Sequence, residues 1–373
     1  MDFERLKKYY GGKKVLITGH TGFKGSWLCA ILVLCGAKVY GYALNPPQKD
    51  GLFDIIFGKG AGEASGSGLK LFGRDGLLFC ESHIGDIRDF DELKEFYDSV
   101  RPDYVFHLAA QPIVRDSYRI PRETYETNVM GTVNLLECIR LLPCPKAVLN
   151  VTTDKVYMNE ERPDYGYRED DKLDGFDPYS NSKSCSELVT HSYKASFFSE
   201  KGPAISTARA GNVIGGGDFA NDRIIPDCVR AASRGERIFI RNPYSVRPYQ
   251  HVLEPLYVYL EICALSGEDK KYEGWYNVGP DDRDCVTTGE LSDMFTAAWG
   301  EGIAKENAKA PDGPHEANFL KLDNSKIKDV FSWSPNWDVR TAVKKTVDWS
   351  KAWLKGNEDA NLEMEKQIRE FFG

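Results

Sequence analysis

Apolar and polar positions follow two different spacings along the first half of the chain. Short runs of Val, Ile, Leu and aromatic residues predict buried strands at Lys14–Thr18, Lys38–Tyr42, Tyr104–Leu108, Ala147–Thr152 and Ala204–Ala210. Longer stretches with helical spacing predict helices at Ser26–Cys35, Glu123–Leu142 and Ser180–Phe198. This order of strands and helices is typical of parallel strands joined by crossover helices. The expected fold class is therefore α/β, with an open, doubly wound and mostly parallel sheet.

The pattern changes after about Gly215, where Gly, Pro, Asp and Arg interrupt shorter segments. We interpret residues 1–204 as one domain that contains the sheet. Residues 205–373 are expected to form a smaller C-terminal α+β domain, with chain segments crossing back to the first domain. The glycine-rich stretch 58–76 is expected to be a flexible surface insertion in the first domain.

Charge and composition exclude several classes of protein. The chain has 48 Lys and Arg against 56 Asp and Glu, a net charge of −8, which argues against general nucleic-acid binding. No apolar run approaches the ~20 residues of a membrane-spanning helix, and the first residues lack the apolar core of a signal sequence. The nine cysteines and six histidines show no metal-ligand spacing. We expect a reduced, cytoplasmic protein without a nucleic-acid partner, a membrane partner or a metal.

The first candidate site is the pattern Gly19-x-x-Gly22-x-x-Gly25, between the first expected strand and its helix. Glycines in this place allow a tight turn and let a pyrophosphate approach the helix N-terminus, which indicates a dinucleotide site. The alternative is an ordinary glycine-rich turn. The second strand ends without the acidic residue that usually binds the ribose, so Asn45 or the backbone is expected to do so. No Arg lies there for a 2′-phosphate, which favours NAD over NADP.

The second candidate site is the pair Tyr179 and Lys183, which a helix would place one turn apart on the same side. A nearby ammonium can lower the pKa of a phenol, so that the tyrosine becomes a base near neutral pH. The same spacing also occurs twice before the first strand, where it cannot reach the carboxyl ends of the strands. The alternative interpretation is an exposed pair on a helix surface.

The third candidate site is Thr153, Asp154 and Lys155, directly after the strand expected at Ala147–Thr152. Ligands of open α/β sheets bind at the carboxyl ends of the strands. A hydroxyl can orient a substrate alcohol there, and a neighbouring carboxyl and amine can act as an acid and a base. The alternative is a salt bridge within a loop.

Together with longer stretches, these residues resemble the extended short-chain dehydrogenase/reductase superfamily, and within it the family of CDP-glucose 4,6-dehydratases. Lys155 is the most discriminating residue, because related dTDP-glucose and GDP-mannose dehydratases carry Glu after the Asp. The resemblance runs from Gly19 to about Asp323 and is carried by GHTGFKGSWL, SHIGDIRD, HLAAQPIVRDSY, TTDKVY, DPYSNSK, ARAGNVIGGGDFANDRIIPD, IRNPYSVRPYQHVLEP, NVGPDD and PHEANFLKLD. It implies an NAD-binding Rossmann domain, followed by a smaller nucleotide-sugar-binding domain.

The resemblance also implies a reaction, the dehydration of CDP-D-glucose to CDP-4-keto-6-deoxy-D-glucose. C4 is oxidised with NAD, water is lost across C5 and C6, and the hydride returns to C6. Tyr179 is expected to take the C4 hydroxyl proton, with Thr153 bound to the same oxygen. Lys183 would stabilise the phenolate and hold the nicotinamide ribose. Asp154 is expected to be the acid at C6 and Lys155 the base at C5.

Further binding residues follow from the same resemblance. With Tyr179 and Lys183, the residues expected to bind the cofactor are Gly19, Thr21, Gly22, Phe23, Gly25, Asn45, Asp86, Ile87, Ala109, Ala110, Gln111 and Asn128. Those expected to bind the nucleotide sugar are Asn212, Arg223, Arg241, Arg247, Asn277, His315 and Glu316. A homodimer or homotetramer is expected, because the two long helices resemble those that pack against copies of themselves in this superfamily.

Three other functions stay open at this point. A nucleotide-sugar 4-epimerase, or a dehydratase of another nucleotide-glucose, uses the same Thr, Tyr and Lys. An epimerase does not need an acid and a base at C5 and C6, so the Asp154-Lys155 pair disfavours it. A non-catalytic NAD-binding sensor is expected to lack Tyr179 or Lys183, and both residues are present.

Overall fold

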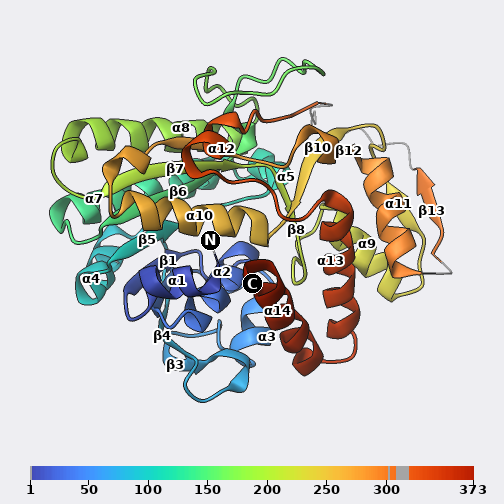
Figure 1. Ribbon diagram of the computed structural model, residues 1–373, viewed down its shortest axis with the longest axis horizontal. Helices are drawn as coiled ribbons and strands as arrows, with labels where there is room; N and C mark the ends of the chain where they lie inside the picture. Colours follow the sequence, from blue (N-terminus) through green and yellow to red (C-terminus); the bar gives the residue numbers. More distant parts are fainter. Residues whose placement is uncertain (1, 301–302, 308–318) are drawn as a thin grey trace.

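Eight strands form the central sheet of the computed structural model, which describes residues 2–300, 303–307 and 319–373 (Figure 1). All neighbouring strands are parallel except β3, which pairs antiparallel with β4 at one edge. The spatial order of the strands is β11 (Trp275–Val278), β7 (Ala204–Ala210), β6 (Ala147–Thr153), β5 (Tyr104–His107), β1 (Lys14–Thr18), β2 (Lys38–Ala43), β4 (Leu78–Ile84) and β3 (Gly66–Lys70). The strand order reverses between β1 and β5, and open sheets of this kind bind ligands at such a point.

Helices cover both faces of the sheet, because successive strand residues point to opposite faces and both sets are apolar. Val15 and Ile17 pack on one face, whereas Leu16 packs on the other. The first face is covered by α1 (Phe3–Tyr10), α2 (Phe23–Leu34), α3 (Leu52–Phe57), α10 (Leu253–Ser266), α12 (Ser325–Phe331) and α14 (Asn357–Phe372). The second is covered by α4 (Phe90–Val100), α7 (Gly131–Leu141) and α8 (Pro178–Tyr193). No helix in the described ranges is both long and apolar enough to cross a membrane.

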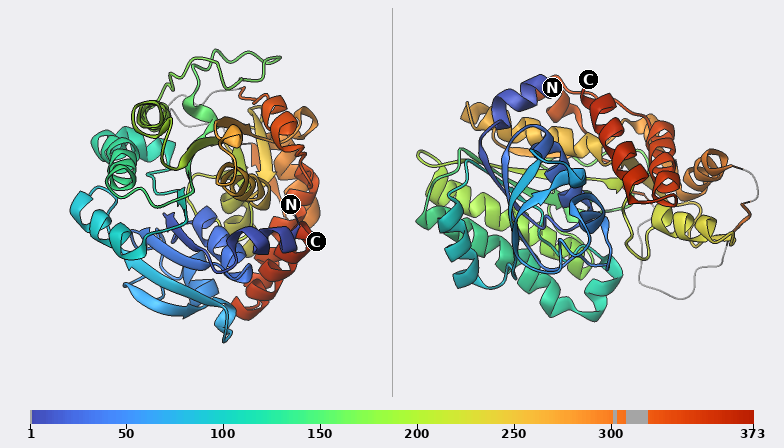
Figure 2. Two further views of the ribbon diagram at one scale, coloured as in Figure 1. Left: turned by 60° about the vertical axis from the view of Figure 1, so that its left-hand side comes forward. Right: turned by 90° about the horizontal axis from the view of Figure 1, so that it is seen from below.

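A smaller group of helices and short strands lies beside the main sheet (Figures 1 and 2). Its own apolar core includes Ile225, Tyr249, Leu291 and Val343. β10 pairs with β8 and β12, and β13 pairs with β9. The elements are β8 (Asn212–Ile214), α9 (Ile224–Ser233), β9 (Ile238–Ile240), β10 (Val246–His251), β12 (Cys285–Thr287), α11 (Thr288–Trp299), β13 (Lys305–Asn307) and α13 (Val339–Trp353).

The predicted α/β class and the mostly parallel sheet are confirmed. β1 and β7 have the predicted bounds, and the other three predicted strands differ from β2, β5 and β6 by one residue. The helix predicted at Glu123–Leu142 is interrupted by a π-helical turn at Glu126–Met130, between α6 (Pro121–Tyr125) and α7. α5 (Val114–Arg119) precedes α6. A second π-helical turn, Lys194–Phe198, follows α8.

The C-terminal half returns to the main sheet at several places. The boundary that we predict between residues 204 and 205 falls at the first residue of β7, and β11 forms the sheet edge beside β7. α10 packs on β6 and β7. β11 and α10 are therefore segments of the C-terminal half that lie on the main sheet, of the kind that we expect to cross back to the first domain.

The glycine-rich stretch 58–76 differs from its prediction. It is not a structureless insertion, because Gly66–Lys70 forms β3 and pairs with β4. Leu71, directly after β3, is fully buried in the core. The prediction of a flexible insertion is wrong for Gly66–Lys70. Glycine content indicates flexibility only where the backbone has no partner, and here β4 supplies one.

Candidate active site

A cavity of about 1160 Å³ lies at the carboxyl ends of the strands, between the sheet and the smaller group of elements. The turn after β1, the loop after β5 and the end of β6 all contribute to its wall. Most of the predicted site residues line it: Gly19, Thr21, Gly22, Phe23, Gly25, Asn45, Asp86, Ile87, Ala109, Ala110, Gln111, Thr153, Lys155, Tyr179, Lys183, Asn212, Arg223, Arg241 and Arg247.

The glycine turn after β1 is shaped for close approach. Gly19 has a φ of +78°, and a Cβ at this position would lie 2.7 Å from the backbone N of Ala109. A Cβ at Gly25 would lie 2.2 Å from the carbonyl oxygen of Gly19. Gly22 is the N-cap of α2, and no side chain caps the helix there. The first backbone N–H groups of α2 are therefore available to a phosphate, which fits a dinucleotide pyrophosphate.

The residues expected at the adenosine end lie on two neighbouring strand ends. Asn45 is exposed just after β2, and Asp86 and Ile87 follow β4. The side chain of Arg88 donates to both oxygens of Asp86, at 2.6 to 3.0 Å, and holds the pKa of that carboxyl below its usual value. A carboxylate in this state is an acceptor for ribose hydroxyls or an adenine amine.

Asn128 lies behind the cavity wall. It is buried, its Oδ1 accepts from the backbone N of Gln111 at 2.8 Å, and its Nδ2 donates to Ser182 at 2.9 Å. Asn128 therefore connects the loop after β5 to α8, and it does not line the cavity.

Tyr179 and Lys183 occupy the first turns of α8. The side chain of Asp177 caps this helix by accepting from the backbone N of Ser180 at 2.9 Å. Burial raises the pKa of Tyr179 to about 12, against the opposing effect of a hydrogen bond with Thr153. Burial lowers the pKa of Lys183 to about 8, and its Nζ donates to the carbonyl of Val151 at 3.1 Å. The predicted lowering of the Tyr179 pKa is therefore not found in this structure, because burial dominates.

Asp154 and Lys155 form an ion pair at the end of β6. Lys155 Nζ lies 2.8 Å from Asp154 Oδ1 and 3.4 Å from Asn212 Oδ1. Thr153 donates to the same Oδ1 at 3.0 Å. Asp154 is fully buried, and its Oδ2 has no hydrogen-bond partner among the described residues, whereas the side chain of Lys155 is 30% exposed. The amine of Lys155 therefore reaches the cavity, whereas Asp154 is not among the residues that line it.

Three arginines of the smaller group of elements form part of the cavity wall. Arg223 pairs with Asp218 at 2.9 Å, and Arg241 pairs with Asp222 at 2.6 Å. Arg247 lines the same wall from β10, and its Nη1 donates to the carbonyl of Val246. Arginine side chains can bind two phosphate oxygens at once, so this wall suits a diphosphate.

One of the predicted substrate residues, Asn277, is not brought to this wall. Asn277 is fully buried in β11, where its Nδ2 donates to the carbonyl oxygens of Tyr167 and Asp323. Its Oδ1 accepts from Tyr157, so all its polar atoms are used inside the protein. The prediction of a substrate contact for Asn277 is therefore wrong in this structure. His315 and Glu316 lie outside the described residues.

Residues 15–279 match the family model described as the NAD dependent epimerase/dehydratase family. The chain belongs to this family. It is 45% identical to a CDP-glucose 4,6-dehydratase of Salmonella typhimurium, over 98% of both chains. It is 26% identical to a CDP-paratose 2-epimerase of Salmonella typhi, over 91% of this chain and 99% of the relative.

Solved structures of family members share the fold. The dTDP-glucose 4,6-dehydratase of Bacillus anthracis in complex with NAD has a TM-score of 0.70 at 20% identity, over 91% of this chain and 97% of that chain. The UDP-glucose 4-epimerase of Stenotrophomonas maltophila with bound NAD has a TM-score of 0.76 at 19% identity, over 92% and 99%. The family's cofactor is NAD, and the glycine turn of this chain fits a dinucleotide.

Sequence reasoning did not include Lys24, which also lines the cavity. Burial, followed by the charges of Arg223 and Lys183, lowers the pKa of Lys24 to about 7. The available signal was its place inside the glycine pattern, two residues after Gly22 at the start of α2.

Proposed function

We propose that this chain converts CDP-D-glucose to CDP-4-keto-6-deoxy-D-glucose with NAD as a catalytic cofactor. The observation that carries the proposal is the Asp154–Lys155 pair, which lies beside the Tyr179 helix and reaches the cavity through its amine. An acid next to a base is the requirement for losing water, and an exchange of configuration at C4 alone does not need it. The relative that is 45% identical over 98% of both chains supports the cytidine nucleotide.

The first step assigned to the chain is removal of the C4 hydroxyl proton. Tyr179 takes this proton as its phenolate, and Thr153 binds the same substrate oxygen. Bound NAD supplies the acceptor for the C4 hydride and later the donor to C6. Lys183 is the nearby cation on α8, and its positive charge stabilises the phenolate, whose pKa is otherwise raised by burial. Gly19 and the first turn of α2 hold the pyrophosphate.

The second step is the loss of water across C5 and C6. The ion pair of Asp154 and Lys155 becomes a neutral acid and a neutral amine when one proton passes from Nζ to Oδ1, over the 2.8 Å between them. The amine of Lys155 then takes the C5 proton, which the C4 ketone has made acidic. The carboxylic acid of Asp154 gives its proton to the C6 hydroxyl, which leaves as water. These transfers restore the ion pair that the structure shows. Addition of the hydride at C6 then requires one proton at C5, which the ammonium of Lys155 gives. The proton that Tyr179 took from the C4 hydroxyl passes to solvent and makes up this loss, so that phenolate and ion pair are both regenerated.

The diphosphate of the substrate is assigned to the arginine wall of Arg223, Arg241 and Arg247, with Asn212 near the reacting end. Arg241 already has Asp222 as a partner, so a bound diphosphate competes with that carboxylate. His315 and Glu316 keep their predicted roles as part of this proposal.

A panel of nucleotide sugars tests the proposal. Purified protein with NAD is incubated with CDP-, dTDP-, UDP- and GDP-glucose, and the 4-keto product is measured by its absorbance after treatment with alkali. CDP-glucose is expected to be turned over, and the others only weakly. Comparable turnover of dTDP-glucose would contradict the cytidine assignment. Formation of a C4 epimer without a keto sugar would instead support the 4-epimerase.

We also propose a cytoplasmic homo-oligomer, built on the exposed face of α5 to α8. These helices and the turns beside them carry several exposed apolar side chains, including Tyr118, Met130, Leu188 and Phe197. Covering such a face with a second copy removes this apolar surface from water. All nine cysteines are free, as in proteins of a reducing compartment. Sedimentation of the protein with and without Met130→Lys distinguishes a dimer through this face from a monomer.

A further inference from the structure

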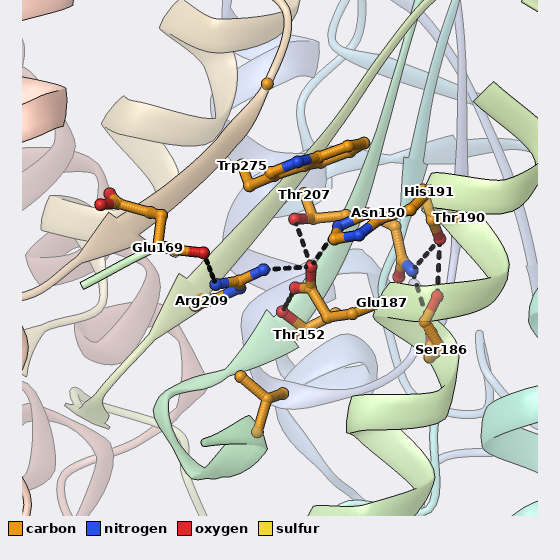
Figure 3. Close-up of polar contacts among 12 residues, drawn as sticks. Asn150, Thr152, Glu169, Ser186, Glu187, Thr190, His191, Thr207, Arg209 and Trp275 are labelled. Atoms are coloured by element: carbon orange, nitrogen blue, oxygen red, sulfur yellow. Dashed lines mark hydrogen bonds and ion pairs between the residues drawn. The ribbon is translucent and has the colours of Figure 1, made fainter. Parts of the chain in front are cut away.

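A buried ion pair joins α8 to β7 (Figure 3). Arg209 Nη2 lies 2.9 Å from Glu187 Oε2, and the side chains of both residues are fully buried. Glu187 is on the same helix as Tyr179 and Lys183, four residues after Lys183. The pair takes no part in the reaction steps assigned above.

The carboxylate of Glu187 binds two neighbouring strands, β6 and β7. Thr152 of β6 donates to its Oε1 at 2.5 Å, and Thr207 of β7 donates to its Oε2 at 2.8 Å. His191, one turn further along α8, lies 3.2 Å from the same Oε2 and stacks on Trp275 (Figure 3). Two strands and one helix are therefore fixed at a single carboxylate.

Arg209 binds the chain on the other side of the acid–amine pair. Its Nη1 donates to the hydroxyl of Tyr157 at 2.8 Å and to the carbonyl of Glu169 at 3.0 Å. Tyr157 comes two residues after Lys155, and Thr152 comes two residues before Asp154. The Glu187–Arg209 pair thus holds both ends of the segment that carries Thr153, Asp154 and Lys155.

Stability alone does not explain such a pair, because well-packed apolar residues often replace a buried ion pair without loss. An ion pair with fixed hydrogen bonds does something that apolar packing does not, since it sets the direction and distance of each bound group. In this chain, the ion pair binds both ends of the segment that carries Thr153, Asp154 and Lys155. It also binds α8, the helix that carries Tyr179 and Lys183.

We propose that Glu187 and Arg209 are positioning residues, which set Thr153–Lys155 against Tyr179 and Lys183. Glu187 also lies one helical turn after Lys183 on α8. The proposal rests on the roles that the proposed function gives to those five catalytic positions. It adds two residues that touch neither substrate nor cofactor.

The charge effect of Glu187 on Lys183 is opposed by the other surroundings. Lys183 is buried, and its charge acts on Lys24 of α2 and on His107 of β5. Burial lowers the pKa of Lys183, and the Glu187 carboxylate raises it against that effect. Loss of the carboxylate charge is therefore expected to release the proton of Lys183 at lower pH.

Two threonines provide a matched test of positioning. Thr152→Val and Thr207→Val each remove one hydroxyl from the same carboxylate, and only Thr152 belongs to the strand that leads into Thr153. We expect Thr152→Val to lower kcat about tenfold or more, since small displacements of catalytic groups are costly, and Thr207→Val to stay within about twofold of wild type. Similar melting temperatures for the two variants make the comparison valid. Equal kcat values for the two variants would contradict the positioning role.

Two substitutions of Glu187 separate charge from position. Glu187→Gln keeps the acceptor oxygen and loses the charge, so the fall of kcat/KM at alkaline pH should begin about one pH unit lower. Glu187→Asp keeps the charge and shortens the side chain, so it should keep the alkaline limit and lower kcat. NAD affinity, measured by fluorescence titration of the cofactor-free protein across pH, should weaken at lower pH in Glu187→Gln than in wild type.

The outcomes distinguish this proposal from the proposed function. If wild type does not turn over CDP-glucose, the proposed function fails, and the pH dependence of NAD affinity still tests Glu187. Wild-type kcat, alkaline limit and NAD affinity in both Glu187 variants, with only a lower melting temperature, would overturn the positioning role. If the Glu187 variants do not fold, the threonine pair decides.

Discussion

Asp154–Lys155 and Glu187–Arg209 are two acid–cation pairs at the same end of the sheet, and they differ in how fully the acid is bound. Both oxygens of Glu187 accept hydrogen bonds, and both side chains of that pair are buried. Asp154 has an oxygen without a partner among the described residues, and Lys155 is partly exposed to the cavity. A carboxylate with an unused oxygen, next to a partly exposed amine, is able to exchange protons with a substrate. A carboxylate whose two oxygens both accept hydrogen bonds holds the neighbouring elements in place.

Breaking the reactive pair should have the largest effect on turnover. Lys155→Met removes the proposed base at C5, and we expect dehydration to fall by about 10²–10⁴, the range for a lost general base. Oxidation at C4 does not need Lys155, so reduced nicotinamide should accumulate and exchange of the C5 proton with deuterated solvent should slow. Absorbance and proton NMR follow these two quantities. Near-normal dehydration would mean that Lys155 is only a salt-bridge partner.

Asp154→Asn should stop the same reaction at a different place. The amide cannot protonate the departing C6 hydroxyl, so we expect product formation to fall by at least about 10². Exchange of the C5 proton should continue, because Lys155 remains and its partly exposed amine can lose its proton to solvent in place of Asp154. Mass spectrometry of the sugar in deuterated solvent checks this. Loss of both exchange and product would show that the two roles are not divided as assigned.

Breaking the buried pair should act on stability first. Arg209→Met leaves the Glu187 carboxylate buried without its cation, which typically costs about 3–5 kcal/mol of unfolding free energy. Urea unfolding measures this loss, with Lys155→Met as the comparison. A smaller loss for Arg209→Met than for Lys155→Met would reverse the contrast between the two pairs.

At acid pH, protonation of Glu187 should lower the stability of the protein. Burial alone would raise the pKa of Glu187, but the charge of Arg209 and the hydrogen bonds hold it at about 2, below the usual 4.5. The stability that this carboxylate contributes is therefore complete above about pH 4.5 and is lost as the pH falls toward 2. Unfolding free energies measured across this range should fall more steeply in wild type than in Glu187→Gln. Equal pH dependence of the unfolding free energy in the two proteins would show that protonation of Glu187 does not affect stability.

An exposed pair provides the smallest effect. Arg140 and Glu137 lie one helical turn apart on α7, and their side chains are 37% and 25% exposed. Arg140→Ala should change the unfolding free energy by only about 0–1 kcal/mol, as for other solvent-screened pairs, and should leave turnover unchanged. Thermal unfolding and a turnover assay together check this. A loss as large as that of Arg209→Met would show that burial does not explain the contrast.

Sequence reasoning could predict the parts of the site that depend on local pattern. The glycine turn, Tyr179 with Lys183, and the residues after β6 each lie within a few positions of a recognisable strand or helix, and the structure brings all of them to one edge. Asn277 also follows a strand pattern. Its place was not predictable, because β11 lies at the far edge of the sheet and residues distant in sequence, Tyr167 and Asp323, take its side chain.

The Glu187–Arg209 pair was not predicted from the sequence, for a different reason. Glu187 has the appearance of an ordinary polar helix residue, and its burial depends on which face of α8 meets the sheet. Arg209 did carry a signal, since a strand whose every residue is buried needs a partner for a charged side chain. Finding that partner required the pairing of α8 with β6 and β7, which is a tertiary property.

The return of β11 to the main sheet has a consequence for how the protein reaches its native state. β7 pairs on one side with β6 and on the other with β11, whose residues are synthesised about 65 positions later. A nascent or truncated chain that ends near residue 210 therefore exposes β7 as an open strand edge, which invites association with other chains. Such sequence-distant pairings also slow folding. The N-terminal half of the chain is therefore not expected to fold stably before β11 has been synthesised. Without β11, we expect the partly folded chain to aggregate instead of forming the active site.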